Sequence, residues 1–233
     1  CERLTAMASS TTPAPNTDVD AVVVGAGHNG RVTAAYLARA GLSTLLVEAR
    51  DQVGGTAASE LFAGATVNIC NCDHLTFRTT PVMEELGLAD HGLEYLEVEP
   101  AQHNMSWASA SEGVGWSAHH DLEATLDEIG RVAPRDVEGY RRYAKAAMPA
   151  VRMIFEAAAQ PPTVAGLTRI ALRRKLAGTP ALLRWSRRST ADVLRDFFDS
   201  EILRGPGAMT GPMVWGISPE FDGSGLGALT HAM

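Results

Sequence analysis

The sequence is poor in the features that mark several special classes of protein. Its 3 cysteines in 233 residues argue against a disulfide scaffold and suit a reducing compartment, so we expect a cytoplasmic protein. No apolar run approaches the length needed to cross a bilayer, and glycine and proline are too scarce for a low-complexity chain. With 45% hydrophobic and 20% charged residues, the composition is that of an ordinary globular protein.

The two halves of the chain differ in charge and in pattern. Residues 1–130 carry 5 basic and 18 acidic residues, whereas residues 131–233 carry 15 and 9, so the halves face different surroundings. Residues 1–19 hold no apolar stretch of the secretory type, and we expect a disordered N-terminal arm there. No internal repeat is visible.

The segment from Asp20 to Glu48 predicts a βαβ unit. Residues 20–25 read DAVVVG, a run without polar alternation that is typical of a parallel strand buried on both faces. Apolar residues at helical spacing follow between residues 28 and 40, Gly41 ends the helix, and residues 42–48 read as a second strand. We therefore expect a doubly wound α/β sheet of the Rossmann-like type, entered through a right-handed crossover.

The turn between the first strand and the helix matches the pattern G-x-G-x-x-G. Gly25 permits the tight turn, Gly27 lets a diphosphate approach the backbone, and Gly30 lets the helix pack closely on the strand. The helix N-terminus then favours an anion. The predicted dinucleotide-binding residues of this turn are Gly25, Ala26, Gly27, His28, Asn29 and Gly30.

Glu48 ends the second strand, where a carboxylate accepts hydrogen bonds from the adenosine ribose. It would repel a 2′-phosphate, which disfavours NADP and leaves FAD or NAD as the cofactor. The alternative is a structural glycine turn beside an exposed Glu48. We expect His28 to take no part in catalysis, because side chains in such turns usually face solvent or cap the helix.

The sequence that follows, EARDQVGGTAA, resembles a large family of FAD-dependent oxidoreductases that includes phytoene dehydrogenases and amine oxidases. The opening VVVGAGHNG is most similar to the phytoene dehydrogenase-like branch, with the pyridine nucleotide-disulphide oxidoreductase domain-containing proteins. The resemblance is strong over residues 20–60 and implies FAD as cofactor. It also implies roles in FAD binding for Glu48, Ala49, Arg50, Gly54, Gly55 and Thr56. Many relatives have Arg where Thr56 stands, so no salt bridge to FAD is expected from that position.

The rest of the chain predicts short mixed elements and then helices. We expect an FAD-binding βαβ region over 20–80 and a partial substrate domain over 81–233, with the C-terminal FAD-binding segment of the family missing. Strands are expected within 65–77, at 94–99 and at 104–108, and a short helix at 81–88. Longer helices are expected at 122–130, 136–159, 168–178 and 190–205, the last capped by Thr190. The tail after Gly205 shows no helix and looks truncated.

Other cysteine and histidine residues that could bind metal or take part in catalysis are explained more simply by packing or helix capping. If their segment is a strand, Cys70, Cys72 and His74 share one face of it, which allows a metal site or a wall of the flavin or substrate site. Such side chains diverge, however, and a fourth ligand is not evident. We expect ordinary packing and no metal. His119 and His120 precede Asp121, which we expect to cap a helix. No catalytic residue is assigned.

Residues 169–195 contain eight basic residues and one acidic residue, interleaved with apolar ones. This composition allows peripheral contact with an anionic membrane, whereas a solvated helical face is the simpler interpretation; nucleic acid is not expected in so acidic a protein. The resemblance implies hydride transfer to flavin from a lipophilic, polyene or carotenoid-like substrate. The alternatives are amine oxidation, a non-enzymatic escort protein of the same fold, and an inactive fragment of a flavoenzyme.

Overall fold

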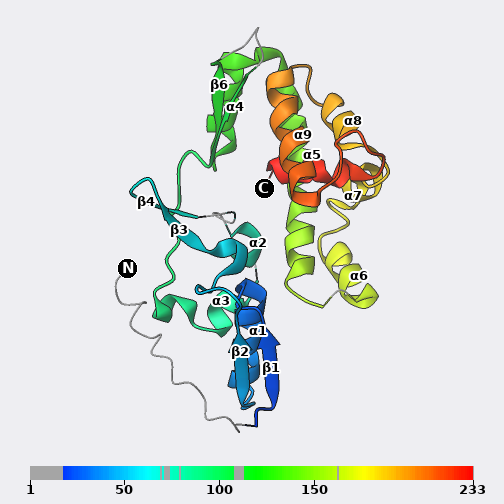
Figure 1. Ribbon diagram of the computed structural model, residues 1–233. Helices are drawn as coiled ribbons and strands as arrows, with labels where there is room; N and C mark the ends of the chain where they lie inside the picture. Colours follow the sequence, from blue (N-terminus) through cyan, green and yellow to red (C-terminus); the bar gives the residue numbers. More distant parts are fainter. Residues whose placement is uncertain are drawn as a thin grey trace. The chain divides into compact units, whose positions relative to one another are not determined.

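The computed structural model describes residues 18–68, 70, 74–78, 80–107, 113–161 and 163–232 (Figure 1). The chain divides into two compact units, one ending at Leu93 and one beginning at Glu94. Most of the predicted N-terminal arm lies outside the described residues, and the predicted domain limits stay predictions. Within the described part of the chain, no helix is both long and apolar enough to cross a membrane.

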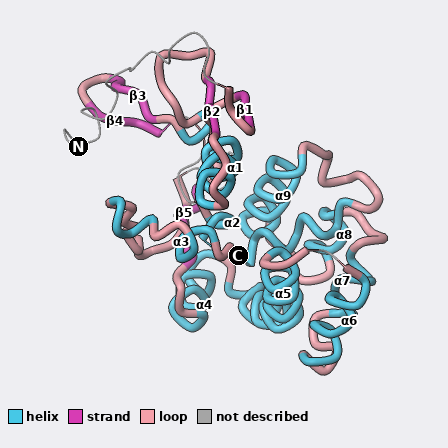
Figure 2. The backbone as a smooth tube through the Cα atoms, turned by 90° about the horizontal axis from the view of Figure 1, so that it is seen from below, coloured by secondary structure: helices cyan, strands magenta, loops and turns pink. Residues whose placement is uncertain are grey.

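The first unit opens with the predicted βαβ crossover. Strand β1 (Ala21–Val24) pairs in parallel with β2 (Thr44–Val47), in a register that joins Ala21 to Thr44 and Val24 to Val47. Helix α1 (His28–Arg39) connects them and packs against both strands (Figure 2). Gly41 follows the helix at φ +89°, a backbone conformation that favours glycine. The Rossmann-like fold class is confirmed.

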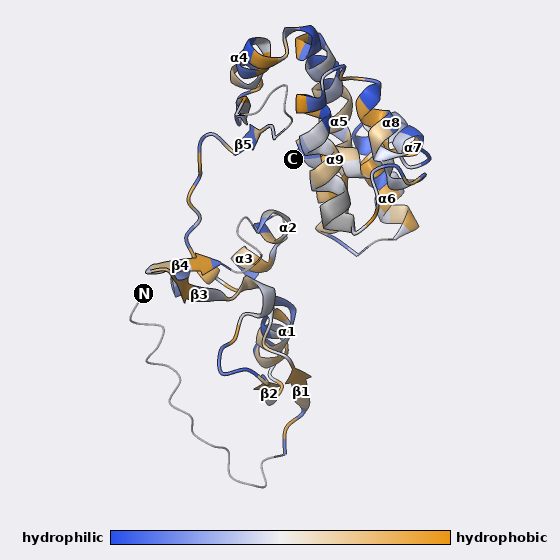
Figure 3. Cartoon of the chain, turned by 45° about the horizontal axis from the view of Figure 1, so that its top comes forward, coloured by the Kyte–Doolittle hydropathy of each residue, from blue (hydrophilic) through white to orange (hydrophobic). Residues whose placement is uncertain are grey.

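The prediction that the first strand is buried on both faces is wrong for this structure. Val22 and Val24 are 56% and 83% exposed, although the strands are apolar (Figure 3). Among the described residues only β2 pairs with β1, and α1 covers one side of the pair. The side chains of β1 therefore alternate between partly covered and exposed positions.

A β-hairpin follows the crossover. Strand β3 (Ser59–Phe62) pairs antiparallel with β4 (Ala65–Asn68), and the two turn residues Ala63 and Gly64 both have positive φ. The strand predicted within 65–77 is present as β4, and its partner β3 was not predicted. After η2 (Gly55–Ala57) and this hairpin come α2 (Leu75–Arg78), α3 (Val82–Glu85) and η3 (Leu88–His91).

The second unit consists of a hairpin and a helical body. Strands β5 (Gln102–Met105) and β6 (Gly115–Ala118) pair antiparallel, whereas the strand expected at 94–99 is absent and the one expected at 104–108 ends at Met105. The helices are α4 (Leu122–Val132), η4 (Pro134–Asp136), α5 (Val137–Ala158), α6 (Val164–Arg173), α7 (Thr179–Trp185), α8 (Thr190–Arg195), α9 (Glu201–Trp215) and η5 (Ser224–Ala232).

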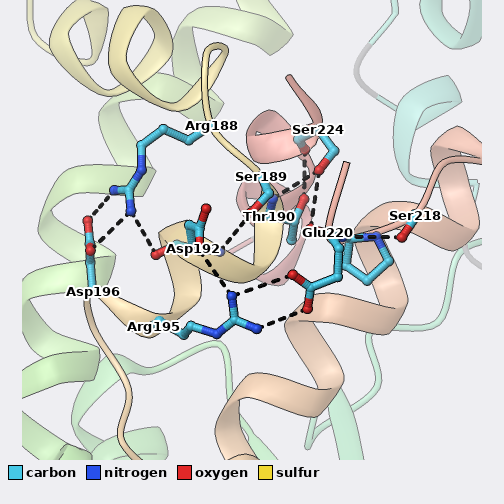
Figure 4. A network of polar contacts seen from close by, with 10 residues as sticks. Arg188, Ser189, Thr190, Asp192, Arg195, Asp196, Ser218, Glu220 and Ser224 are labelled. Atoms are coloured by element: carbon cyan, nitrogen blue, oxygen red, sulfur yellow. Dashed lines mark hydrogen bonds and ion pairs between the residues drawn. The ribbon is translucent and has the colours of Figure 1, made fainter. Parts of the chain in front are cut away.

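The helix predicted over 190–205 is interrupted, and its cap was misassigned. The buried carboxylate of Asp136 accepts hydrogen bonds from the N–H groups of Asp199 (2.6 Å) and Ser200 (3.0 Å), which ends α8 and starts α9 as separate helices. Ser189, not Thr190, caps α8, since its hydroxyl accepts from Asp192 N–H at 3.0 Å (Figure 4).

Two further helix predictions need correction. Helix α9 continues past Gly205 to Trp215, where no helix was expected. The helix predicted over 168–178 occupies 164–173 instead, because the chain turns through Lys175 and Leu176, both at positive φ, before α7 begins with Pro180 in its first turn.

Aromatic side chains form the core of the second unit. Trp116, Tyr143 and Phe198 are almost fully buried. The rings of Tyr143 and Trp185 stack with an interplanar angle of 3°, and Trp116 Nε1 donates to the Ile202 carbonyl at 3.1 Å. These contacts join β6, α5, α7 and the start of α9, so residues far apart in sequence hold this unit together.

Candidate dinucleotide site

The glycine turn lies where the βαβ unit was predicted to bind a diphosphate. Gly25 follows β1 at φ +96°, and its N–H donates to the Val47 carbonyl at 2.7 Å. Gly27 is the N-cap of α1 and no side chain caps this end. Arg31 N–H reaches the Gly27 carbonyl at 3.0 Å, so helix geometry leaves the N–H groups of the first turn without intrahelical acceptors. These groups suit an anion.

Gly30 holds α1 against the turn. A Cβ atom at this position would lie 1.9 Å from the Gly25 carbonyl oxygen and 3.5 Å from Val23 Cγ1. The first distance is far inside van der Waals contact, so only glycine allows this approach. The role assigned to Gly30 from the motif therefore agrees with its surroundings, although its part in cofactor binding stays a prediction.

The second glycine pair lies directly against the first turn. Gly54 N–H donates to the Ala26 carbonyl at 2.9 Å, and Gly27 and Gly54 form a parallel bridge. A Cβ on Gly55 would lie 3.0 Å from Gly27 Cα. We call residues 25–30 together with Gly54 and Gly55 the glycine cradle. The sequence placed the pair near a cofactor only through the family resemblance, and its contact with the first turn was not predicted.

Glu48 joins the cradle through main-chain hydrogen bonds. One carboxylate oxygen accepts from Ala26 N–H at 2.8 Å and the other from Arg50 N–H at 3.0 Å. The N–H groups of Arg50 and Ala26 lower the pKa of Glu48, so the side chain is ionised at neutral pH. Its side chain is 17% exposed and has lone pairs to spare for ribose hydroxyls. The bond to Ala26 was not foreseen, and it occupies a donor that could otherwise face a phosphate.

The remaining predicted cofactor-binding residues surround the cradle at its surface. His28 and Asn29 are exposed, as expected at this turn, whereas Ala26 is buried. Ala49 and Arg50 are exposed, and the Arg50 guanidinium lies 3.9 Å from the Glu48 carboxylate. Thr56 is exposed on η2. The structure thus brings the predicted residues into one region of the first unit.

The cysteine and histidine pattern does not form a strand face. Strand β4 ends at Asn68, Cys70 is an exposed free cysteine, and His74 has a φ of 50° before α2. Cys72 lies outside the described residues. The expected alignment of Cys70 with His74 is therefore wrong, and the described residues include no cluster of three or more metal-ligand side chains.

His119, His120 and Asp121 serve the start of α4. Asp121 accepts from Ala124 N–H at 2.9 Å, which confirms the expected cap. His119 Nδ1 lies 2.5 Å from a Glu99 carboxylate oxygen, and this contact lowers the pKa of Glu99. The arrangement accounts for these side chains without a catalytic role.

Comparison with known proteins supports a dinucleotide-binding domain in the first unit. Residues 23–86 match the family model of the NAD(P)-binding Rossmann-like domain. A limonene dehydrogenase polypeptide of Castellaniella defragrans is 38% identical over 122 residues, which cover 52% of this chain and 22% of that protein. Phytoene desaturase (lycopene-forming) of Pantoea ananas is 36% identical over 126 residues, 52% of this chain and 24% of its own.

A longer match extends through both units. Pyridine nucleotide-disulfide oxidoreductase domain-containing protein 2 of Rattus norvegicus is 28% identical over 244 residues, covering 93% of this chain and 41% of that protein. The chain therefore spans less than half the length of these relatives. A solved structure of putrescine oxidase has the same fold, with a TM-score of 0.52 at 21% identity over 94% of this chain and 42% of that one.

The sequence matches confirm the resemblance expected from the motifs, and the matched domain indicates a dinucleotide-type cofactor. The chain thus contains a region that matches the NAD(P)-binding Rossmann-like domain, and it is similar in sequence to phytoene desaturases and to pyridine nucleotide-disulfide oxidoreductase domain-containing proteins.

Proposed function

We propose that the glycine cradle binds FAD and that the protein is a flavin-dependent oxidoreductase acting on an apolar organic substrate. The observation that carries the proposal is the convergence of two glycine segments, 27 residues apart, at the uncapped end of α1. A structural turn needs the first segment alone. The second segment adds a shallow backbone surface beside the helix N-terminus, which a cofactor diphosphate requires.

The residues present fit FAD. Gly27 carries no side chain above the turn, and an added Cβ there would meet only Gly55 Cα at 3.8 Å, so the space over Gly27 is open to a ligand. The N–H groups of the first helical turn would face an anion bound there, and the ionised Glu48 suits ribose hydroxyls while disfavouring a 2′-phosphate. Arg50 is exposed beside Glu48, within reach of a diphosphate or ribose.

Bound flavin supplies the chemistry, because it accepts a hydride from the substrate. The chain's own residues bind and orient the adenosine and diphosphate parts: the cradle by its backbone, Glu48 by its carboxylate. We assign no catalytic side chain. The proposal concerns cofactor placement, which is the part of the reaction that these residues perform.

Names of relatives favour an apolar substrate. Limonene and phytoene, which appear in the names of two relatives, are hydrocarbons, and both relatives match about half of this chain. We therefore propose a lipophilic, polyene or carotenoid-like substrate in preference to an amine. The likeness to putrescine oxidase shows a common fold and does not favour C–N oxidation.

The test is an absorption spectrum of the purified chain, with and without added FAD. We expect the two near-ultraviolet and blue bands of oxidised flavin, and release of FAD on denaturation. Gly27→Ala should fold normally, because its φ of −67° suits alanine and the nearest atom to the new Cβ is 3.8 Å away, yet it should lose flavin. Gly130→Ala, inside α4 of the second unit and also with the nearest atom 3.8 Å from the new Cβ, is the matched control and should keep flavin.

Two results would contradict the proposal. A folded chain that stays colourless with excess FAD would favour a non-enzymatic binding protein of the same fold. Equal flavin content in Gly27→Ala and the parent chain would place the cofactor elsewhere.

A further inference from the structure

Helix α6 presents apolar side chains to solvent. Val164 is 84% exposed and Leu172 is 65% exposed, whereas Gly166 and Ile170 are buried in a helix that packs on α5. Val164, Thr168 and Leu172 follow one another at intervals of four residues and so lie along one line of the helix. This line faces away from the buried pair, at about half a turn around the helix axis. An apolar outer face on a surface helix calls for an explanation.

The turn after α6 extends this surface. Lys175 and Leu176 are consecutive non-glycine residues with φ of 50° and 60°, a conformation that such residues adopt rarely. Both side chains are exposed, and Leu176 is 51% exposed. The strained turn therefore holds a cation and an apolar side chain in solvent next to the outer face of α6.

The stretch of sequence that contains these apolar residues is rich in basic residues and has no acidic ones. Between Glu156 and Asp192 the sequence contains seven basic residues and no acidic one, in a chain whose net charge is −7. Some are neutralised: Arg173 and Arg174 contact Glu156, and Arg184 and Arg188 contact Asp196 (Figure 4 shows the Arg188 contact). Arg169, Lys175 and Arg187 form no ion pair with any residue that the structure describes.

We propose that this surface docks on a bilayer that contains anionic phospholipid. We define the basic apolar surface by six exposed residues of α6 and its following turn: Val164, Leu167, Arg169, Leu172, Lys175 and Leu176. The leucines and Val164 enter the boundary between headgroups and acyl chains, and Arg169 and Lys175 pair with lipid phosphates. The inference does not depend on FAD or on the proposed oxidoreductase activity.

The basic apolar surface combines cations with apolar side chains, and this combination fits an anionic bilayer better than other partners. Nucleic acid would use the cations but would leave exposed leucines unburied. A second copy docked by the same surface would oppose identical cations, which repel each other. An anionic bilayer satisfies both halves of the surface, since it offers phosphate and hydrocarbon within a few ångströms.

The experiment is co-sedimentation of the 233-residue chain with vesicles of phosphatidylcholine alone or mixed with phosphatidylglycerol. We expect binding to the mixed vesicles, weakened by salt, and little binding to phosphatidylcholine. Leu172→Asp should weaken binding by about tenfold, through loss of apolar burial and added repulsion. Lys175→Glu should weaken it by about fivefold or more.

Two matched control variants carry the same kinds of substitution, Leu to Asp and a basic residue to Glu, at exposed positions outside the basic apolar surface. Leu61→Asp alters a leucine that is 79% exposed in the first unit, and Arg135→Glu reverses an exposed cation on η4. Both should bind like the parent chain. Far-ultraviolet circular dichroism checks that each variant is folded, and the salt dependence of the parent chain tests the proposal even if one variant fails to fold.

Three outcomes would overturn the proposal: equal binding to both vesicle types, binding that Leu172→Asp and Lys175→Glu leave unchanged, or absence of binding by the folded parent chain. If the parent chain formed a dimer without vesicles and Leu172→Asp were monomeric, a second copy of the chain would cover this surface instead of a bilayer.

Discussion

The two units of the chain are stabilised in different ways. The first has few buried side chains among its described residues, with Ala26 and Ala34 its buried apolar ones, and its strands leave Val22 and Val24 exposed. The second unit buries a cluster that includes Trp116, Tyr143 and Phe198. In the first unit, main-chain hydrogen bonds and close glycine contacts set the geometry, whereas in the second unit side-chain packing does so.

The two units should therefore be sensitive to different kinds of substitution. A site made of backbone atoms fails when a side chain is added, and a packed core fails when a side chain is removed. The four tryptophans, at positions 107, 116, 185 and 215, all belong to the second unit, so tryptophan fluorescence originates there. The first unit has to be followed by another signal, such as amide exchange of its strands.

The largest effect is expected from truncation of the aromatic core. Phe198→Ala should lower the free energy of unfolding of the second unit by about 3–5 kcal/mol, because it removes a ring that contacts Tyr140 and Tyr143. Urea titration followed by tryptophan fluorescence measures it. Phe221→Ala, at a phenylalanine that is 65% exposed, should change little and serves as the control. Equal losses in both variants would show that the aromatic cluster is not the core.

The next effect is expected from filling the close contact of the glycine turn. Gly30→Ala adds a Cβ 1.9 Å from the Gly25 carbonyl oxygen, so α1 must move away from β1. We expect the first unit to lose about 1–3 kcal/mol of stability. Hydrogen exchange of the β1 and β2 amides should accelerate while tryptophan fluorescence stays unchanged. Unaltered exchange would mean that α1 does not pack on the turn in solution.

A smaller effect should depend on pH through Glu48. The N–H groups of Arg50 and Ala26 hold its pKa below the ordinary value of 4.5. The folded unit therefore favours the carboxylate, and this contribution is present above pH 4.5 and lost as pH falls through the lower folded-state pKa. Acid titration of the first unit, followed by amide exchange, should be less steep in Glu48→Gln. If Glu48→Gln and the parent chain gave the same acid titration, the Glu48 carboxylate would not contribute to the stability of the turn.

The smallest effect should stabilise the second unit. Gly130 lies inside α4, and the nearest atom to an added Cβ is Val137 Cγ2 at 3.8 Å, an ordinary contact. Gly130→Ala should raise the stability of this unit by about 0.5–1 kcal/mol, since alanine loses less backbone entropy in a helix. The urea midpoint by tryptophan fluorescence measures the change. A decrease would indicate that this part of α4 is not helical in solution.

Local patterns predicted the features that local forces determine. The strand, glycine turn and helix from residue 20 to residue 48 were foreseen because backbone sterics and apolar periodicity act over a few residues. The Asp121 cap is of the same kind. The cofactor-binding roles remain predictions, although the predicted residues lie together around one turn.

Features set by distant contacts were missed. Asp136 divides a continuous helical pattern by binding N–H groups 63 and 64 residues away. The Thr190 hydroxyl, expected as a cap, donates instead to the Ser224 carbonyl at 2.7 Å. The contact of Gly55 with Gly27 depends on the path of the chain after β2, which no periodicity encodes. Exposure of Val22 and Val24 depends on which strands lie beside β1.

The glycine cradle also has a consequence for biosynthesis. Its parts, from Gly25 to Gly55, come from one continuous stretch that precedes the helical unit in the chain. Because synthesis proceeds from the N-terminal side, this stretch emerges from the ribosome before the helical unit is translated. A cofactor that binds the nascent cradle would stabilise it by mass action. If that cofactor is FAD, as proposed, cellular FAD supply would influence the yield of folded protein as well as its loading with cofactor.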